Sequence, residues 1–269
     1  MEPLTARPIE TARAAARLAG RIQLQGMNSH LEIDHKGRYD LVTDVDRRSE
    51  RAIIATLGEA FPDVGILAEE DSPTAPGSNE MWIVDPLDGT TNYASGYPAF
   101  CVSIALRVAS EIVLAVVYEP VRDELFEAVA GQGARLNGSA IRVSETRELS
   151  ESLLATGFPY DRCEQPETNL DRFCAMTMRT RGVRRGGSAA LDLCYTACGR
   201  LDGYWEIRLN PWDVSAGALI VQEAGGQITG LAGDSYDWSG MDNLASNGLL
   251  HQKLVESLAR LDPPAPCFG

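Results

Sequence analysis

Two aspartates that closely follow an apolar run are the residues of this chain best suited to chemistry. The apolar residues 82–84 predict a strand that ends at Asp85, and Asp88 follows three positions later. Pro86 forces a bend and Gly89 completes a turn, so backbone carbonyls near both carboxylates are freed from the sheet. Because hard cations such as magnesium prefer oxygen ligands, this segment predicts a metal site.

Thr90 and Thr91 follow this turn and predict the start of a helical turn. The N–H groups at such a start can receive a phosphate. The alternative is an ordinary turn without a site, because Asp-Pro and Asp-Gly pairs are common turn formers. The complete string over residues 82–91 is more specific than its parts and favours a site.

Two further segments carry carboxylates. Glu69 and Glu70 directly follow the apolar residues 66–68, a pattern that is also usual in a solvated loop. Asp213 lies near the start of a predicted helix that begins around Pro211, where an acid is favourable in itself. From the residues alone, each segment stays open between a structural acid and a metal ligand.

Taken together, the three segments resemble the strings of the inositol monophosphatase family. The resemblance extends from about Leu41 to Asn247 and keeps the family's order and spacing. It implies an α/β fold of the five-layer α/β/α/β/α sugar-phosphatase type, magnesium dependence, lithium sensitivity and frequently a homodimer. We therefore expect a phosphomonoesterase that hydrolyses myo-inositol monophosphate to inositol and phosphate with metal-activated water.

The resemblance also implies a set of ligands for each of two Mg²⁺ ions. Glu69, Asp85 and the Leu87 carbonyl are expected to hold the first ion, and Asp85, Asp88 and Asp213 the second. Glu69 would also contact a third, looser ion through water. Paired cations suit this reaction because they neutralise the phosphate dianion, lower the pKa of a bound water and stabilise the departing alkoxide.

The catalytic residues implied by the resemblance are Glu69, Thr90 and Asp46. Glu69 and Thr90 would orient the attacking water, with the Thr90 hydroxyl paired with Asp46. Thr43 or Asp44 can cap the helix that follows, and Asp44 is interpreted as such a cap and not as a site residue. Lys36 lies in a segment whose register with the family is not clear and is left out of the site.

Substrate contacts follow from the same resemblance. The loop-to-helix turn at Gly187, Ser188 and Ala189 would bind the sugar hydroxyls together with Glu206. The amides of Gly89 and Thr90 would bind the phosphate. Glu206 could otherwise be a surface acid at a strand edge. The complete expected substrate-binding set is Asp88, Gly89, Thr90, Gly187, Ser188, Ala189, Glu206 and Asp213.

Other functions stay open as alternatives. A fructose 1,6-bisphosphatase or a 3′,5′-bisphosphonucleotide phosphatase would share the metal core, and Arg184 and Arg185 could receive a second phosphate. Residues 181–206 resemble the inositol phosphatases better. A non-catalytic regulatory protein on the same fold is disfavoured, because such a protein has little chemical reason to keep adjacent carboxylates that repel one another.

Composition limits the partners and the compartment. The 269 residues include 38 acidic and 24 basic side chains, for a net charge of −14, and 44% of the chain is hydrophobic. Such a chain has an ample core and repels polyanions, so we expect no nucleic acid and no membrane as partner. Six scattered cysteines, without a secretory signal at the start, suggest reduced thiols and a cytoplasmic enzyme.

The pattern of apolar residues and turn formers predicts two domains packed around a cleft. Residues 1–146 would form an α+β domain with most of the metal ligands, and residues 147–269 an α/β domain with Asp213 and the substrate contacts. The glycine-rich residues 131–138 indicate a hairpin turn, and Cys194 and Cys198 indicate buried structural thiols. Helices are expected over 9–27, 44–61, 168–179, 188–199 and 212–224, and strands over 64–67, 81–84, 100–108, 111–118, 124–129, 141–143, 153–156 and 203–207.

Overall fold

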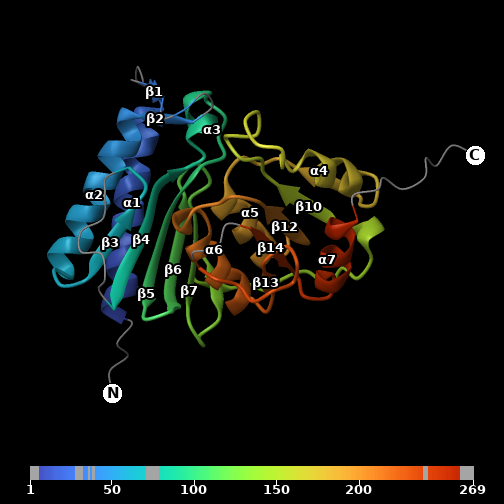
Figure 1. Cartoon of the computed structure of the whole chain (residues 1–269). Helices are drawn as coiled ribbons and strands as arrows, with labels where there is room; N and C mark the ends of the chain where they lie inside the picture. The colour runs from blue at the N-terminus through green and yellow to red at the C-terminus, as the bar shows by residue number, and fades with distance from the viewer. Residues whose placement is uncertain are drawn as a thin grey trace, which may run out of the picture.

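The structure is a computed structural model that describes residues 6–27, 33–35, 37, 40–70, 79–238 and 242–260. Its helices and two large sheets stack in five alternating layers, helix, sheet, helix, sheet and helix (Figure 1). The layered α/β fold predicted from the sequence is therefore confirmed. In the described part of the chain, no helix is long and apolar enough to cross a membrane.

The first helical layer consists of α1 (Ala6–Gly26) and α2 (Asp44–Ala60), which pack against each other and against one face of the larger sheet. The small side chains Ala12, Ala16 and Ala19 of α1 are fully buried and let this helix lie close to the strands. A short hairpin, β1 (Ile33–His35) with β2 (Leu41–Thr43), leads into α2.

The larger sheet has seven strands in the order of the chain, and all neighbours are antiparallel except the first pair. Its central strands are buried along most of their length rather than at alternate residues, because helices cover both faces. The strands are β3 (Gly65–Ala68), β4 (Glu80–Asp88), β5 (Cys101–Val108), β6 (Glu111–Glu119), β7 (Glu124–Val129), β8 (Ala134–Leu136) and β9 (Ser139–Ala140).

The middle layer joins the two sheets. It consists of α5 (Ala189–Ala197) and α6 (Pro211–Glu223), and α6 contacts strands of both sheets. Residues 214–221 of α6 are buried without interruption, as expected for a helix with apolar neighbours on all sides. A Cβ at Gly217 would lie 2.6 Å from Leu193 of α5, so the two helices of the middle layer pack closely here.

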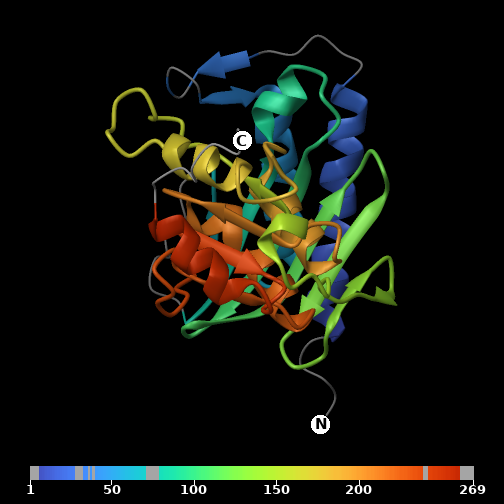
Figure 2. The same cartoon turned by 90° about the vertical axis from the view of Figure 1, so that its right-hand side faces the viewer.

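The second sheet has five strands in the order β11-β10-β12-β14-β13, with β10 parallel to both of its neighbours. The helices α4 (Leu170–Thr177) and α7 (His251–Ala259) cover its outer face (Figure 2). Its strands are β10 (Leu153–Thr156), β11 (Gly182–Arg184), β12 (Gly203–Glu206), β13 (Gln227–Thr229) and β14 (Asn243–Ser246). The larger sheet comes from residues 65–140 and this one from 153–246, but the predicted domain division stays a prediction.

Two expectations about local structure are wrong. Residues 141–143 form no strand; instead the N–H groups of Ile141 and Val143 bind the carbonyls of Ala134 and Ala224 along the edge of the core. The strand expected to end at Val84 continues to Asp88 through an irregularity in its pairing. The sequence pattern also did not indicate the last helix or the short strands β1, β2, β8, β9, β11, β13 and β14.

Replacing Gly217 by Ala is expected to destabilise the protein, because the added methyl group must displace Leu193 in the tightly packed middle layer. The expected loss is about 1–3 kcal/mol in the free energy of unfolding measured with urea. Gly58 in α2 is the matched control, since nothing lies within 4 Å of the position of its Cβ. Gly58→Ala is expected to stabilise by about 0.5–1 kcal/mol. Equal stability of the two variants would contradict this account of the α5–α6 contact.

Candidate active site

A β-bulge in β4 places the first two predicted carboxylates. Asp85 pairs with Ser103 and Asp88 with Cys101, so three steps along β4 correspond to two along β5. The additional residue lets Pro86 occupy a strand position without donating a hydrogen bond. β3 runs parallel to β4 and ends beside it, which brings Glu69 to the same edge of the sheet.

The carbonyl groups of the bulge have partners outside the sheet. The Pro86 carbonyl accepts a hydrogen bond from Nε2 of Gln23, at 2.7 Å, and Gln23 is fully buried in α1. The Leu87 carbonyl, predicted as a metal ligand, lies 3.1 Å from the Thr90 hydroxyl oxygen. The Asp85 carboxylate accepts the N–H of Leu87 at 2.9 Å. These contacts hold the carbonyls and carboxylates of the bulge in fixed directions.

Asp46 and Thr90 form the predicted pair. The Thr90 Oγ1 lies 2.8 Å from Oδ1 of Asp46, closer than it lies to the Leu87 carbonyl, so its single proton is best placed toward Asp46. The other oxygen of Asp46 accepts the N–H and the hydroxyl of Thr43, which is the N-cap of α2. The interpretation of Asp44 as the cap is therefore wrong: Thr43 caps the helix and Asp44 is its first residue.

Asp88 connects the larger sheet to the start of α5. Its Oδ2 accepts the Ser188 hydroxyl at 2.6 Å and the Ala190 N–H at 2.7 Å, and its Oδ1 lies 3.3 Å from the Ala189 nitrogen. Donors at a helix start stabilise a carboxylate. Burial nevertheless raises the pKa of Asp88 above its usual range, although the Ser188 hydrogen bond opposes that shift.

Asp213 combines a structural role at a helix start with a place beside the other acids. Its Oδ2 accepts the N–H of Asn210 at 2.7 Å and so caps the start of α6. Its carboxylate also faces the other acids: burial, followed by the charge of Glu69, raises its pKa well above the usual range. A first-turn acid and a component of the carboxylate cluster are thus the same residue.

The acids Glu69, Asp85, Asp88 and Asp213 form one carboxylate cluster. Burial and then the charges of the other three members hold the pKa of Asp85 well above its usual range. Buried charges of one sign are costly until protons or cations neutralise them. The oxygen donors of this cluster therefore fit hard divalent cations by their chemistry.

The carboxylates do not yet converge as ligands in this structure. Among the described residues, no group of three or more Asp, Glu, His or Cys side chains has a geometry that could hold a metal ion. Asp85, Asp88 and Asp213 each direct an oxygen toward a backbone N–H instead.

Gly89 separates the carboxylate cluster from the predicted sugar-binding turn. It adopts a left-handed conformation with φ of 99° and is the N-cap of α3 (Thr90–Ala94), as predicted for the helical turn. A Cβ at this position would lie 2.9 Å from the Ala99 carbonyl and 3.3 Å from the Gly187 carbonyl. Only glycine combines this conformation with such a close approach of three backbone segments.

The predicted substrate contacts Gly187, Ser188, Ala189 and Glu206 lie on the other wall of the site. The Glu206 carboxylate accepts the Tyr204 hydroxyl at 2.6 Å. Burial raises the pKa of Glu206 to about 7, although the Tyr204 hydrogen bond and the charge of Arg185 lower it. Glu206 is thus a half-buried acceptor at the end of an inner strand of the second sheet and not a surface acid at a strand edge.

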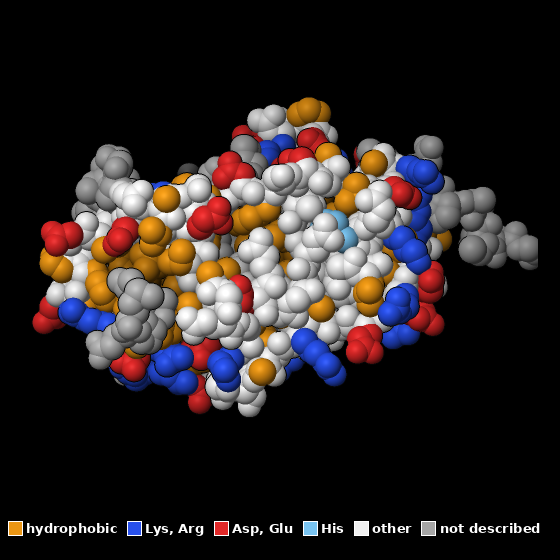
Figure 3. Space-filling view, turned by 90° about the horizontal axis from the view of Figure 1, so that it is seen from below, with side chains coloured by type: hydrophobic (Ala, Val, Ile, Leu, Met, Phe, Trp, Pro, Cys, Tyr) orange, Lys and Arg blue, Asp and Glu red, His pale blue; other side chains and the backbone are white. Residues whose placement is uncertain are grey.

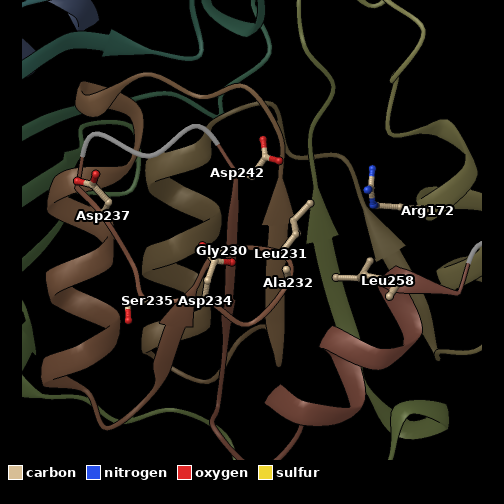
Figure 4. Close-up of a pocket in the computed structure, with 10 residues that line it drawn as sticks. Arg172, Gly230, Leu231, Ala232, Asp234, Ser235, Asp237, Asp242 and Leu258 are labelled. Atoms are coloured by element: carbon tan, nitrogen blue, oxygen red, sulfur yellow. The ribbon is translucent and has the colours of Figure 1, made fainter.

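A cavity of about 80 Å³ brings much of the predicted site together. Glu69, Asp85 and the Asp46–Thr90 pair are not among the residues that line it, although Glu69 and Asp85 act electrostatically on the lining acids. A larger cavity, of about 560 Å³, lies between α4, α7, residues 230–237 and Asp242 and contains no predicted site residue (Figure 4). The predicted residues that line the smaller cavity are Asp88, Gly187, Ser188, Ala189, Glu206 and Asp213.

Three supporting residues were missed by the sequence reading. Gln23 is a single polar residue on the buried, alanine-rich face of α1, and that pattern was its only signal. Nδ2 of Asn92 in α3 donates to the carbonyls of Ala99 and Gly186 and so joins two loops of the site. Cys101, a buried thiol beside Asp88 and Ser188, had no signal at all.

The fold is a layered α/β stack. Its site is a cleft with carboxylates on one side and the Gly187–Ala189 turn on the other. The sequence model of the inositol monophosphatase family matches residues 6–262. The chain belongs to the inositol monophosphatase family.

Similar proteins cover nearly the whole chain. An inositol-1-monophosphatase of Synechocystis is 46% identical over 253 residues, which are 93% of this chain and 88% of that protein. A Nus factor SuhB of Pseudomonas aeruginosa is 41% identical and covers 98% of this chain and 99% of its own. The structure of an inositol monophosphatase from Anabaena superposes with a TM-score of 0.88 at 43% identity and covers 95% of this chain and 96% of its own.

Magnesium is expected to raise the thermal midpoint of unfolding, because cations relieve the repulsion within the carboxylate cluster. At a concentration of about 100 times Kd, binding contributes about 2.7 kcal/mol, or roughly 5–10 °C for a chain of this size. Asp213→Asn is expected to remove most of that increase, whereas Asp63→Asn, at an exposed position after α2, keeps it. An increase of the same size in both variants would contradict the proposed metal position.

The stabilisation by magnesium is expected to decrease as the pH falls. The pKa values of Asp85 and Asp213 are raised, so these groups take up protons at a higher pH than ordinary aspartates. Protons and metal then compete for the same oxygens, and metal affinity falls toward acid pH. Calorimetric titration of the protein with magnesium at several pH values measures this; an affinity that is constant across the carboxylate range would argue against it.

Proposed function

We propose that this protein is a magnesium-dependent phosphomonoesterase that hydrolyses myo-inositol monophosphate to inositol and phosphate. The carboxylate cluster facing the Gly187–Ala189 turn and Glu206 across one cleft is the observation that carries the proposal. Membership of the inositol monophosphatase family supports it. In this proposal Glu69, Asp85, Asp88, Asp213 and the Leu87 carbonyl hold two or three Mg²⁺ ions.

The bound ions would neutralise the phosphate dianion and lower the pKa of the attacking water. The chain's own residues then orient the reactants. Because the Thr90 hydroxyl donates to Asp46, its oxygen presents lone pairs that can accept a hydrogen bond from the attacking water. Glu69, which follows the end of β3, would orient the same water. The backbone N–H groups of Gly89 and Thr90 would receive the phosphate oxygens.

Recognition of the leaving group would fall to the other wall of the cleft. Gly187, Ser188 and Ala189 would contact the ring hydroxyls through the turn that begins α5. Glu206 is a stronger acceptor for a substrate hydroxyl when it is ionised, and its pKa of about 7 makes this contact more favourable above neutral pH. Asp88 and Asp213 border both the metal position and this part of the cleft.

We also infer a homodimer, lithium sensitivity and a cytoplasmic location, which the family resemblance supports. The acidic net charge of −14 argues against nucleic acid as a partner. On the face drawn in Figure 3, basic and acidic side chains are interspersed and do not gather into a stripe of one sign.

The direct test is phosphate release from D-myo-inositol 1-phosphate by the purified protein. Turnover is expected to require magnesium and to fall in Asp88→Asn by more than the roughly 10- to 100-fold that loss of an outer-shell partner of a metal site causes. The thermal midpoint shows whether Asp88→Asn remains folded, and Asp63→Asn is the matched charge control. Full magnesium-dependent turnover by Asp88→Asn would falsify the mechanism.

Thr90→Val is expected to lower kcat by about 100-fold or more, the range that positioned proton-transfer groups contribute. The substitution keeps the shape of the side chain but removes the hydroxyl that links Asp46 to the reaction centre. Thr91→Val changes an exposed neighbour in the same helix and is expected to retain normal turnover. Comparable kcat values for the two valine variants would exclude Thr90 from catalysis.

A bisphosphate substrate is the alternative within the same chemistry. It would use Arg185, which lines the cleft and acts electrostatically on both Asp192 and Glu206. Since these buried acids already compensate that charge, the structure favours a monophosphate. Comparison of kcat/KM for fructose 1,6-bisphosphate and inositol 1-phosphate distinguishes the two substrates.

A second, binding function is also a candidate, because a relative that is 41% identical over 98% of this chain is named Nus factor SuhB. This function would be independent of turnover. Affinity purification with the Asp88→Asn variant tests it: recovery of a stoichiometric protein partner by the inactive variant would support the second function.

A further inference from the structure

The loop between β10 and α4, residues 157–169, forms a wall of the cleft for which the catalytic motifs assign no function. Phe158, Pro159 and Tyr160 of this loop line the same cavity as Asp88 and Asp213. In Figures 1 and 2 the loop, drawn in yellow, lies at the same end of the molecule as α3. Tyr160 is 50% exposed, so a large part of its side chain is available to a ligand in the cleft.

The base of this loop is fixed by a buried asparagine. Nδ2 of Asn169 donates to the Gly157 carbonyl at 2.7 Å and lies 2.9 Å from the Thr156 hydroxyl oxygen. Its Oδ1 accepts the indole N–H of Trp205 at 2.9 Å. A Cβ at Gly157 would lie 2.1 Å from the carboxylate oxygens of Glu206, so the loop begins in direct contact with the predicted substrate acceptor.

The tip of the loop is held by an ion pair with Arg208. Its Nη2 lies 2.9 Å from Oδ1 of Asp161, and the Arg208 side chain is only 22% exposed. Arg208 has φ of 56°, a conformation that is unfavourable for residues other than glycine. Such a strained backbone persists only where the surroundings enforce it, and these positions gather at functional sites. Tyr160 is therefore held between the Asp161–Arg208 pair and the base of the loop.

Tyr160 lines the same cavity as Asp88 and Asp213, so it borders the carboxylate cluster. Burial, followed by the charges of Asp88, Glu69 and Asp213, raises the pKa of its hydroxyl above the usual range. The phenol therefore stays protonated and can donate a hydrogen bond at any pH at which the protein works. Its ring offers an apolar face, and its hydroxyl a polar tip, to a ligand whose phosphate lies at the cluster.

We propose that Tyr160 determines specificity for ring-shaped polyol phosphates and that the Asp161–Arg208 ion pair positions it. The inference rests on the proposed function and concerns the leaving-group end of the same cleft. The face of the phenol packs against the C–H face of a cyclic polyol while its hydroxyl donates to a ring hydroxyl. A short linear polyol phosphate presents no such face and gains little from the contact.

The test compares D-myo-inositol 1-phosphate with the linear glycerol 2-phosphate in steady-state kinetics with magnesium. Tyr160→Ala is expected to raise KM for the cyclic substrate about tenfold with kcat nearly unchanged, because the contact is made equally in the ground and transition states. The kcat/KM for glycerol 2-phosphate is expected to stay within about twofold. Tyr97→Ala, at a tyrosine that is 57% exposed and does not line the cleft, is the matched control.

The positioning role of the ion pair has its own readout. Arg208→Gly removes the guanidinium but suits the left-handed backbone, so the fold is expected to survive while KM rises for the cyclic substrate alone. Arg208→Lys keeps the charge and is expected to restore part of the selectivity. Thermal unfolding of each variant separates this effect from loss of structure.

Two results would overturn the inference: an equal loss of kcat/KM for both substrates in Tyr160→Ala, or no change for either. Both leave the proposed function standing, because the wild-type protein still turns over inositol 1-phosphate. If the wild-type protein hydrolyses neither ester with magnesium, the proposed function itself fails, and the specificity role of Tyr160 falls with it.

Discussion

Repulsion among buried carboxylates is the constraint around which this protein is organised. Glu69, Asp85, Asp88 and Asp213 come from two strand ends, a bulge and a helix start, and no fold would gather them for stability. Burial raises the pKa of each of the three aspartates in this cluster. The surrounding structure tolerates this cost because it supplies N–H donors to these acids, and cations would remove the remainder of it.

Helix starts provide much of that support. Asp46 accepts from the cap of α2, Asp88 from the first residues of α5, and Asp213 from the residue before α6. The positive ends of these helices, α2 in the first helical layer and α5 and α6 in the middle layer, are thus directed at the cleft. Since α6 packs on both sheets, the layers keep these three starts in register, and the geometry of the site depends on the packing of the whole domain stack.

The sequence predicted the chemistry of this site better than its geometry. Turn formers and apolar runs indicated the bend near Asp88 and the helix after Gly89, and the family resemblance indicated the Asp46–Thr90 pair. The sequence could not indicate the bulge in β4, because the register is decided by pairing with β5. It also could not indicate the roles of Gln23 and Asn92, because their partners are backbone carbonyls distant in the chain. Residues 141–143 have the composition of a strand, but they lie past the end of the sheet and bind single carbonyls.

The two contacts of Asp46 restrict the paths by which this sequence can evolve. One carboxylate oxygen closes the capping box of α2 and the other accepts from Thr90. A capping box usually has glutamate or glutamine at this position. Here the additional methylene would move the second oxygen away from Thr90. The capping box alone would accept either acid at this position, but the contact with Thr90 requires aspartate.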